Sequence, residues 1–149
     1  MPLVTRPALP EDAAEIRAVV RAAYARWVPI VGREPRPMQA DYAWAVRQHR
    51  FDLVQADGRI VALLESVARD DHYWVENVAV LPELQGQGLG RQLLGLAEAL
   101  ARAAGLSEVR LLTNGRMAAN RRLYASLGYE ETLEEPIMDG TVVYLRKRL

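Results

Sequence analysis

The segment from residue 78 to residue 94 constrains the fold of this chain more than any other part of the sequence. It reads VAVLPELQGQGLGRQLL, an apolar strand, a proline turn and the glycine-rich start of an amphipathic helix. Glycine lacks a Cβ, so the backbone can take positive φ values and approach a ligand closely. The first N–H groups of a helix have no partner within it, and its dipole adds partial positive charge there. The segment therefore predicts a backbone anion site that could hold a pyrophosphate without a lysine.

The spacing of the glycines restricts the ligand. A Rossmann fingerprint needs G-x-G-x-x-G, and counting from either Gly86 or Gly88 the third glycine is missing. The pair at P-loop spacing, Gly90 and Gly95, is followed by Leu96 where that motif needs lysine. Neither nucleotide-binding motif fits, while a glycine-rich turn that binds no ligand stays open as an alternative.

Two motifs resemble those of a known family. The pattern Gln85-x-x-Gly88-x-Gly90 resembles the Q/R-x-x-G-x-G/A signature of the GNAT family of N-acetyltransferases, and residues 112–129 resemble that family's second motif, M-x-x-N-x-x-L-Y-x-x-L-G-Y/F. Within the second motif Asn120 and Tyr124 share one helix face. Taken alone, the apolar residues of this second motif fit ordinary core packing. Together, in the family's order, the motifs favour membership, and the N-terminal third resembles a bacterial branch of mostly uncharacterised members.

The resemblance implies the GNAT acyl-CoA N-acyltransferase fold, with acetyl-CoA as cosubstrate. In that family the loop holds the pyrophosphate, an asparagine such as Asn120 contacts the pantetheine region, and a tyrosine such as Tyr124 lies beside the sulfur. Free N–H groups on the strand before the loop bind the acetyl carbonyl and pantetheine, which points to Val78 and Val80. The implied cofactor-binding residues are Val78, Ala79, Val80, Gln85, Gly86, Gln87, Gly88, Leu89, Gly90, Arg91, Asn120 and Tyr124.

Acetyl transfer to an amine needs a neutral amine, donors for a developing oxyanion and an acid near the leaving thiolate. Tyr124 is the predicted acid, and the backbone N–H of Val78 is the predicted oxyanion donor. Glu76 is the predicted base, directly or through a water, because it lies two residues before Val78 and is expected on the same face of the strand. A surface role for Glu76, His72 as the base, or water alone remain alternatives.

The acceptor side is expected to come from the first two helices and their connection. The predicted substrate-binding residues are Tyr24, Arg33, Glu34, Asp41 and Tyr42. Aromatic faces and carboxylates suit a cation, whereas arginines suit a carboxylate, so an amino-acid-like acceptor also fits. Trp27 is expected in the core.

Composition bounds the remaining choices. The 149 residues fit a single domain over 1–149, and zero net charge gives no drive toward nucleic acid or anionic membranes. No apolar stretch approaches the ~18 residues of a membrane span, and no signal peptide is visible, so a cytoplasmic protein is expected. The absence of cysteine and the presence of only two histidines argue against a metal site. A homodimer is compatible with the family.

Hydrophobic periodicity gives the order of elements. It predicts a strand at 3–6, helices at 11–26 and 38–48, strands at 51–55, 59–68 and 73–80, a helix at 88–103, a strand at 109–113, a helix at 116–126, and strands at 129–133 and 141–147. With the resemblance, this order predicts an α+β (α/β) fold, a mixed, mostly antiparallel sheet of about six or seven strands flanked by about four helices.

The leading functional hypothesis is an N-acetyltransferase that moves an acetyl group from acetyl-CoA to a primary amine of a small molecule or protein. Direct attack in a ternary complex is expected, because no serine has a G-x-S-x-G context. The alternative from another class is a non-catalytic acetyl-CoA-binding sensor or regulatory module.

Overall fold

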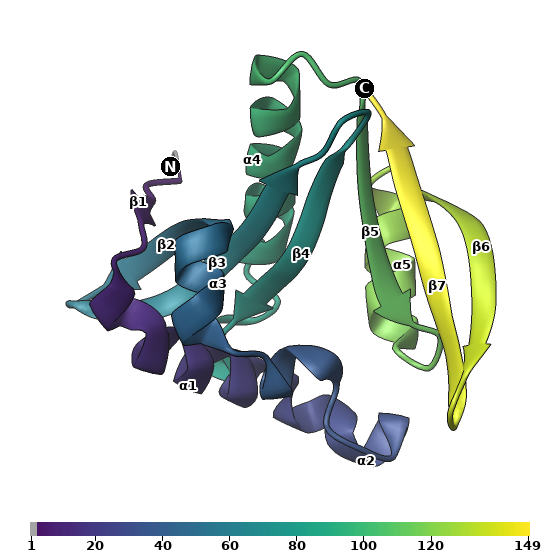
Figure 1. The fold of residues 1–149 in the computed structure, drawn as a ribbon. Coiled ribbons are helices and arrows are strands. Elements are labelled where there is room, and N and C mark those ends of the chain that lie inside the picture. Colours follow the sequence, from purple (N-terminus) through teal and green to yellow (C-terminus); the bar gives the residue numbers. More distant parts are fainter. Residues whose placement is uncertain (1–2) are drawn as a thin grey trace.

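The computed structural model describes residues 3–149, and Met1 and Pro2 of the predicted domain lie outside the described residues. A seven-stranded sheet runs in the order β1-β2-β3-β4-β5-β7-β6 (Figure 1). Its strands are β1 (Arg6–Pro7), β2 (Arg50–Ala56), β3 (Arg59–Ala68), β4 (Tyr73–Val80), β5 (Glu108–Asn114), β6 (Glu130–Ile137) and β7 (Gly140–Arg148). Neighbours pair antiparallel apart from the parallel pair β4–β5. The predicted mixed, mostly antiparallel sheet is confirmed.

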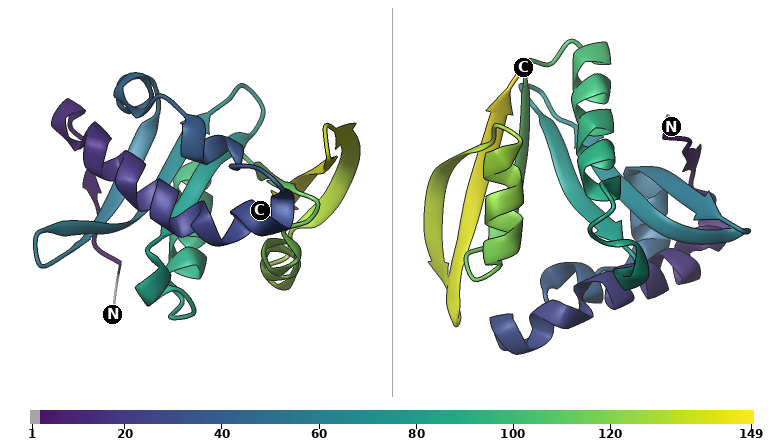
Figure 2. Two further views of the ribbon diagram at one scale, coloured as in Figure 1. Left: turned by 90° about the horizontal axis from the view of Figure 1, so that it is seen from below. Right: turned by 180° about the vertical axis from the view of Figure 1, so that it is seen from behind.

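Helices cover both faces of the sheet. The α-helices are α1 (Ala13–Tyr24), α2 (Val28–Val31), α3 (Tyr42–Gln48), α4 (Leu89–Ala103) and α5 (Ala118–Ser126), and the 3-10 helices are η1 (Pro10–Asp12), η2 (Ala25–Trp27), η3 (Arg36–Gln39) and η4 (Pro82–Leu84). Helices α1 and α3 lie on one face, and α4 and α5 on the other (Figure 2). Among residues 3–149, no helix combines the length and apolar character that crossing a membrane requires.

Each face of the sheet has its own core. Ile16 and Val20 of α1 pack with Leu63 of β3. On the other face, Leu93 of α4 packs with Leu64, the next residue of β3. Successive residues of β3 are thus buried on opposite sides, which explains why this strand is apolar almost throughout instead of alternating with polar residues.

The hairpin between β2 and β3 is where the sequence predicts it. Asp57 and Gly58 have φ values of +52° and +76°. Positive φ at both central residues is typical of the tight turn whose twist matches the flanking strands.

The N-terminal elements differ from the prediction in their bounds. The first strand is not at 3–6 but at Arg6–Pro7, where it pairs with β2. The predicted helix at 11–26 divides into η1, α1 and η2, and the helical path continues through α2 to Val31. The helix predicted at 38–48 begins only at Tyr42, because Ala40 is extended and Asp41 caps α3 by accepting a hydrogen bond from the Trp44 N–H at 3.1 Å.

Candidate functional site

Strands β4 and β5 meet at their starts and then diverge (Figure 1). Their ladder comprises Tyr73 and Trp74 of β4. The N–H of Leu81, just after β4, donates to a carbonyl of β3 at 2.9 Å. Because backbone groups alternate in direction along a strand, those of Val78 and Val80 point the other way, into the gap beside β5. The gap therefore exposes the backbone groups that the sequence assigns to a ligand.

The loop between β4 and α4 presents backbone to this gap. Gly86 and Gly88 have φ values of +80° and +89°, in the left-handed region that favours glycine. A Cβ at either position would meet open space, so conformation and not crowding requires glycine here. Gly88 precedes α4 with no side-chain cap, which leaves the first N–H groups of α4 available to an anion.

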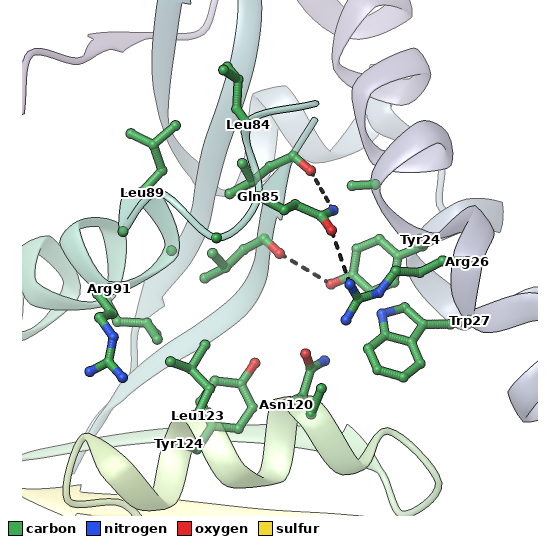
Figure 3. Close-up of a pocket in the computed structure, with 18 residues that line it drawn as sticks. Tyr24, Arg26, Trp27, Leu84, Gln85, Leu89, Arg91, Asn120, Leu123 and Tyr124 are labelled. Carbon is green, nitrogen blue, oxygen red and sulfur yellow. Dashed lines mark hydrogen bonds between the residues drawn. The ribbon is translucent and has the colours of Figure 1, made fainter. Parts of the chain in front are cut away.

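The side chain of Gln85 ties this loop to two neighbouring elements. Its Nε2 donates to the carbonyl of Val80 at 3.0 Å, and its Oε1 accepts from Arg26 of η2 at 3.2 Å (Figure 3). Gln85 thereby holds the loop against the end of β4 and against the segment that follows α1.

Helix α5 forms the opposite wall. Asn120 and Tyr124 both line the pocket from this helix (Figure 3). The Tyr124 ring packs on that of Tyr129, with ring centroids 5.8 Å apart. Burial raises the pKa of Tyr124 to about 12. The phenol therefore keeps its proton at neutral pH and can act as a hydrogen-bond donor.

These walls enclose a pocket of about 320 Å³, within the range of small-molecule sites. Ten of the predicted cofactor-binding residues line it: Val78, Val80, Gln85, Gly86, Gly88, Leu89, Gly90, Arg91, Asn120 and Tyr124. Ala79 does not, because it packs into the core on the α1 side, and Gln87 is not among the lining residues either.

Other lining residues were not anticipated from the sequence as cofactor contacts. They are Ala23, Tyr24, Arg26, Trp27, Leu84, Leu94, Ala119 and Leu123. Tyr24 is a predicted acceptor residue, and Trp27 packs with Val31 and Met117 as its core interpretation predicts, while it also borders the pocket. Most of the remainder are apolar helix positions, which carry no signal that separates a pocket wall from a core.

A bulge in β4 changes the face of Glu76. The register with β3 shifts at this point and leaves Glu76 as the extra residue. Val75 and Val78 both pack on the α4 side, although regular alternation would place residues three apart on opposite faces. The expectation that Glu76 and Val78 share a face is therefore wrong. Glu76 is exposed, and its carboxylate accepts from the Trp74 indole N–H at 2.6 Å.

A buried polar network that the sequence did not indicate joins α1, α3 and β4. The Tyr24 hydroxyl donates to Oδ1 of Asn77 at 2.8 Å and lies 3.4 Å from the Val78 carbonyl. The Nδ2 of Asn77 donates to the Tyr42 hydroxyl at 3.2 Å, and that hydroxyl donates to the Pro37 carbonyl at 2.7 Å. Burial raises the pKa of both tyrosines, so both stay neutral donors.

A buried contact between a carboxyl group and an imidazole ring lies on the same side of the sheet. Glu65 of β3 is cross-strand neighbour to Asn77, and its Oε2 lies 2.6 Å from Nδ1 of His49. Burial raises the pKa of Glu65, and the hydrogen bond with His49 opposes that shift.

The other predicted acceptor residues are engaged elsewhere. Glu34 forms an ion pair with Arg21 at 2.6 Å, Asp41 caps α3, and the Tyr42 hydroxyl belongs to the buried network. Arg33 is exposed and is not among the residues that line the pocket. Of the five predicted acceptor residues, the structure thus brings Tyr24 alone to this pocket.

Solved structures share this fold. PaiA N-acetyltransferase of Thermoplasma acidophilum, in complex with coenzyme A, superimposes with a TM-score of 0.82 at 16% identity over 100% of both chains. A GNAT family acetyltransferase of Elizabethkingia anophelis with acetyl-CoA bound gives a TM-score of 0.73 at 17% identity, over 98% of this chain and 97% of that one.

Sequence comparison finds a curated relative and a family model that match this chain. Over 58 residues it is 38% identical to the aminoalkylphosphonate N-acetyltransferase of Salmonella typhimurium, a match that covers 39% of this chain and 38% of that protein. The match thus spans less than half of the curated relative. Residues 16–129, which are most of the chain and contain both motifs, match the model of the acetyltransferase (GNAT) family. The chain therefore belongs to this family.

Proposed function

We propose that this protein is an acetyl-CoA-dependent N-acetyltransferase that acts on a primary amine of a small molecule or protein. The observation that carries the proposal is the combination, in one pocket, of a free β4 edge, the glycine-rich start of α4 and the Tyr124 phenol. When bound, acetyl-CoA supplies the activated acetyl group. Different walls of the pocket would contact the pyrophosphate, the pantetheine arm and the sulfur of acetyl-CoA.

On the donor side, the loop and the first turn of α4 hold the pyrophosphate through backbone N–H groups. The backbone of Val80 binds the pantetheine arm together with Asn120, and the Val78 N–H stabilises negative charge on the acetyl oxygen. Tyr124 gives its proton to the departing sulfur, for which its raised pKa keeps it protonated.

On the acceptor side, Glu76 is the proposed base. Glu76 lies on the sheet face away from α4, and burial, with a smaller contribution from the charge of Glu76, raises the pKa of Tyr24 and of Tyr42. An amine that reaches β4 from this side gives a proton to the Glu76 carboxylate, directly or through a water. The amine attacks the acetyl carbon in a ternary complex. Tyr24 contacts the acceptor, since it is the predicted acceptor residue that lines the pocket.

Ligand binding is tested first, by thermal unfolding with acetyl-CoA, NAD and ATP. A ligand at about 100 times its dissociation constant adds ~2.7 kcal/mol of stability, so acetyl-CoA should raise the unfolding temperature and the two nucleotides should not. Stabilisation by NAD but not acetyl-CoA contradicts the proposal.

Catalysis is tested by thiol release over a panel of small amines, amino acids and peptides. Release that depends on an amine supports the enzyme. Tight acetyl-CoA binding without release on any member favours the regulatory module instead.

A further inference from the structure

Arg26 reaches the donor pocket from the acceptor side of the molecule. It lies in η2, directly after α1, yet it lines the same pocket as Gly86, Gly88 and Gly90 of the loop (Figure 3). Its guanidinium carbon is 4.4 Å from the centroid of the Trp27 ring, a cation–π distance. Trp27 is itself buried, so the stacked guanidinium has a fixed support beside the loop.

The charge of Arg26 has only a neutral partner in the structure. Its Nη1 donates to the amide oxygen of Gln85 at 3.2 Å. Arg26 takes part in no ion pair among residues 3–149, whereas Arg21, in the preceding helix α1, forms an ion pair with Glu34 at 2.6 Å. A long bond to a neutral amide is weaker than a charge-assisted bond to an anion, so an anion in the pocket would compete successfully for this guanidinium.

We infer that Arg26 is a side-chain anchor for the coenzyme's pyrophosphate, opposite the backbone N–H groups of the loop. This inference rests on the proposed function. The guanidinium exchanges the amide of Gln85 for a phosphate oxygen and stays stacked on Trp27. Arg26 lies in η2, which directly follows α1, the helix that ends at Tyr24. Bound acetyl-CoA therefore connects the end of α1 to the glycine loop.

Calorimetric binding of three probes tests this role without any turnover. Coenzyme A contains a pyrophosphate and a 3′-phosphate, dephospho-coenzyme A contains only the pyrophosphate, and pantetheine contains neither. Arg26→Gln should weaken binding of both coenzymes about tenfold, as expected for loss of one charge-assisted hydrogen bond, and leave pantetheine unchanged. Arg26→Lys keeps the charge but lacks the planar set of N–H donors of the guanidinium, so it should give an intermediate loss of coenzyme affinity.

The control variant is Arg17→Gln, which removes an exposed arginine of α1 that does not line the pocket and should leave all three affinities unchanged. Equal coenzyme affinities in wild type and Arg26→Gln overturn the inference, as does an equal loss for pantetheine. A loss confined to coenzyme A overturns the assignment to the pyrophosphate. Wild-type protein that binds neither coenzyme contradicts the proposed function itself, which is a separate result.

Discussion

The Tyr24 hydroxyl donates a 2.8 Å hydrogen bond to the Asn77 side chain, and so joins the end of α1 to the strand that borders the pocket. Asn77 is 4% exposed and uses its amide nitrogen for a second bond, to Tyr42 of α3. One amide therefore sets the position of two helices on the sheet. Tyr24 borders the pocket, so this bond also fixes one side chain of the site.

Removal of the Asn77 amide should destabilise the fold. Asn77→Ala leaves the hydroxyls of Tyr24 and Tyr42 without this partner, which should lower the free energy of unfolding by about 1–3 kcal/mol. Urea denaturation measures the loss. In a double-mutant cycle with Tyr24→Phe the two changes should be less than additive, since both delete the same bond. Strict additivity would contradict a direct Tyr24–Asn77 interaction.

Tyr124→Phe should slow thiol release while acetyl-CoA binds as in the wild type. The change removes a proton donor without changing the ring that packs on Tyr129. General acid catalysis contributes typically 10²–10⁴-fold, and a loss of about 100-fold is expected. Rates at saturating donor, together with calorimetric affinities, check this. An unchanged rate would remove Tyr124 from the mechanism.

The pH profile should also report on Tyr124. An acid acts only while protonated, and burial raises the pKa of Tyr124 to about 12. Activity that depends on this proton is therefore retained as pH rises toward that value and is lost only above it. We expect Tyr124→Phe to lower the rate by the same factor at every pH between 6 and 9. A factor that shrinks steadily across this range would show that the phenol ionises there.

Much of the fold follows from local sequence, and the exceptions have identifiable causes. The Asp57-Gly58 turn and the start of α4 were predictable, because positive φ values and helix termini depend on residues close in sequence. The bulge at Glu76 was not, because neither glycine nor proline marks it and the register with β3 creates it. The break at Ala40 escaped prediction too, since Met38 and Tyr42 on either side of it are apolar residues at helical spacing.

The same contrast between local and long-range determinants applies to the site. The predicted cofactor-binding residues lie mostly in two contiguous motifs that resemble those of the GNAT family, and ten of them line one pocket. The predicted acceptor residues come from several segments, and only Tyr24, at the end of α1, lies at the pocket. Spacing in the sequence does not show that Arg26 contacts Gln85 or that Glu34 pairs with Arg21. Charge pairing between segments cannot be read from spacing.

Glu65→Gln should change how stability depends on pH. Burial raises the pKa of Glu65 in the folded protein, so its protonated form is favoured on folding. A raised pKa contributes stability below the ordinary value for glutamate, and this contribution is lost as pH rises through the folded-state pKa. The free energy of unfolding of the wild type relative to Glu65→Gln should therefore be greater at pH 4 than at pH 7. Glu135→Gln, at an exposed position of β6, is the control and should show no such trend.

Two glycine substitutions in the same region should have opposite effects. Gly88 has a φ of +89° at the start of α4, whereas Gly95 lies inside that helix, and an added Cβ meets open space at both. Gly88→Ala forces a left-handed conformation on alanine and should cost about 1–2 kcal/mol. Gly95→Ala should instead stabilise the protein by about 1 kcal/mol through helix propensity. Thermal unfolding measures both changes.

The same pair separates helix stability from donor binding. Gly88→Ala should weaken acetyl-CoA binding, because the backbone that faces the pyrophosphate must shift to relieve the strain. Gly95→Ala should leave the affinity unchanged, since residue 95 does not line the pocket. Equal affinities for wild type, Gly88→Ala and Gly95→Ala would contradict a pyrophosphate site at this loop. A stable but weakly binding Gly88→Ala would show that the left-handed glycine serves the ligand as well as the turn.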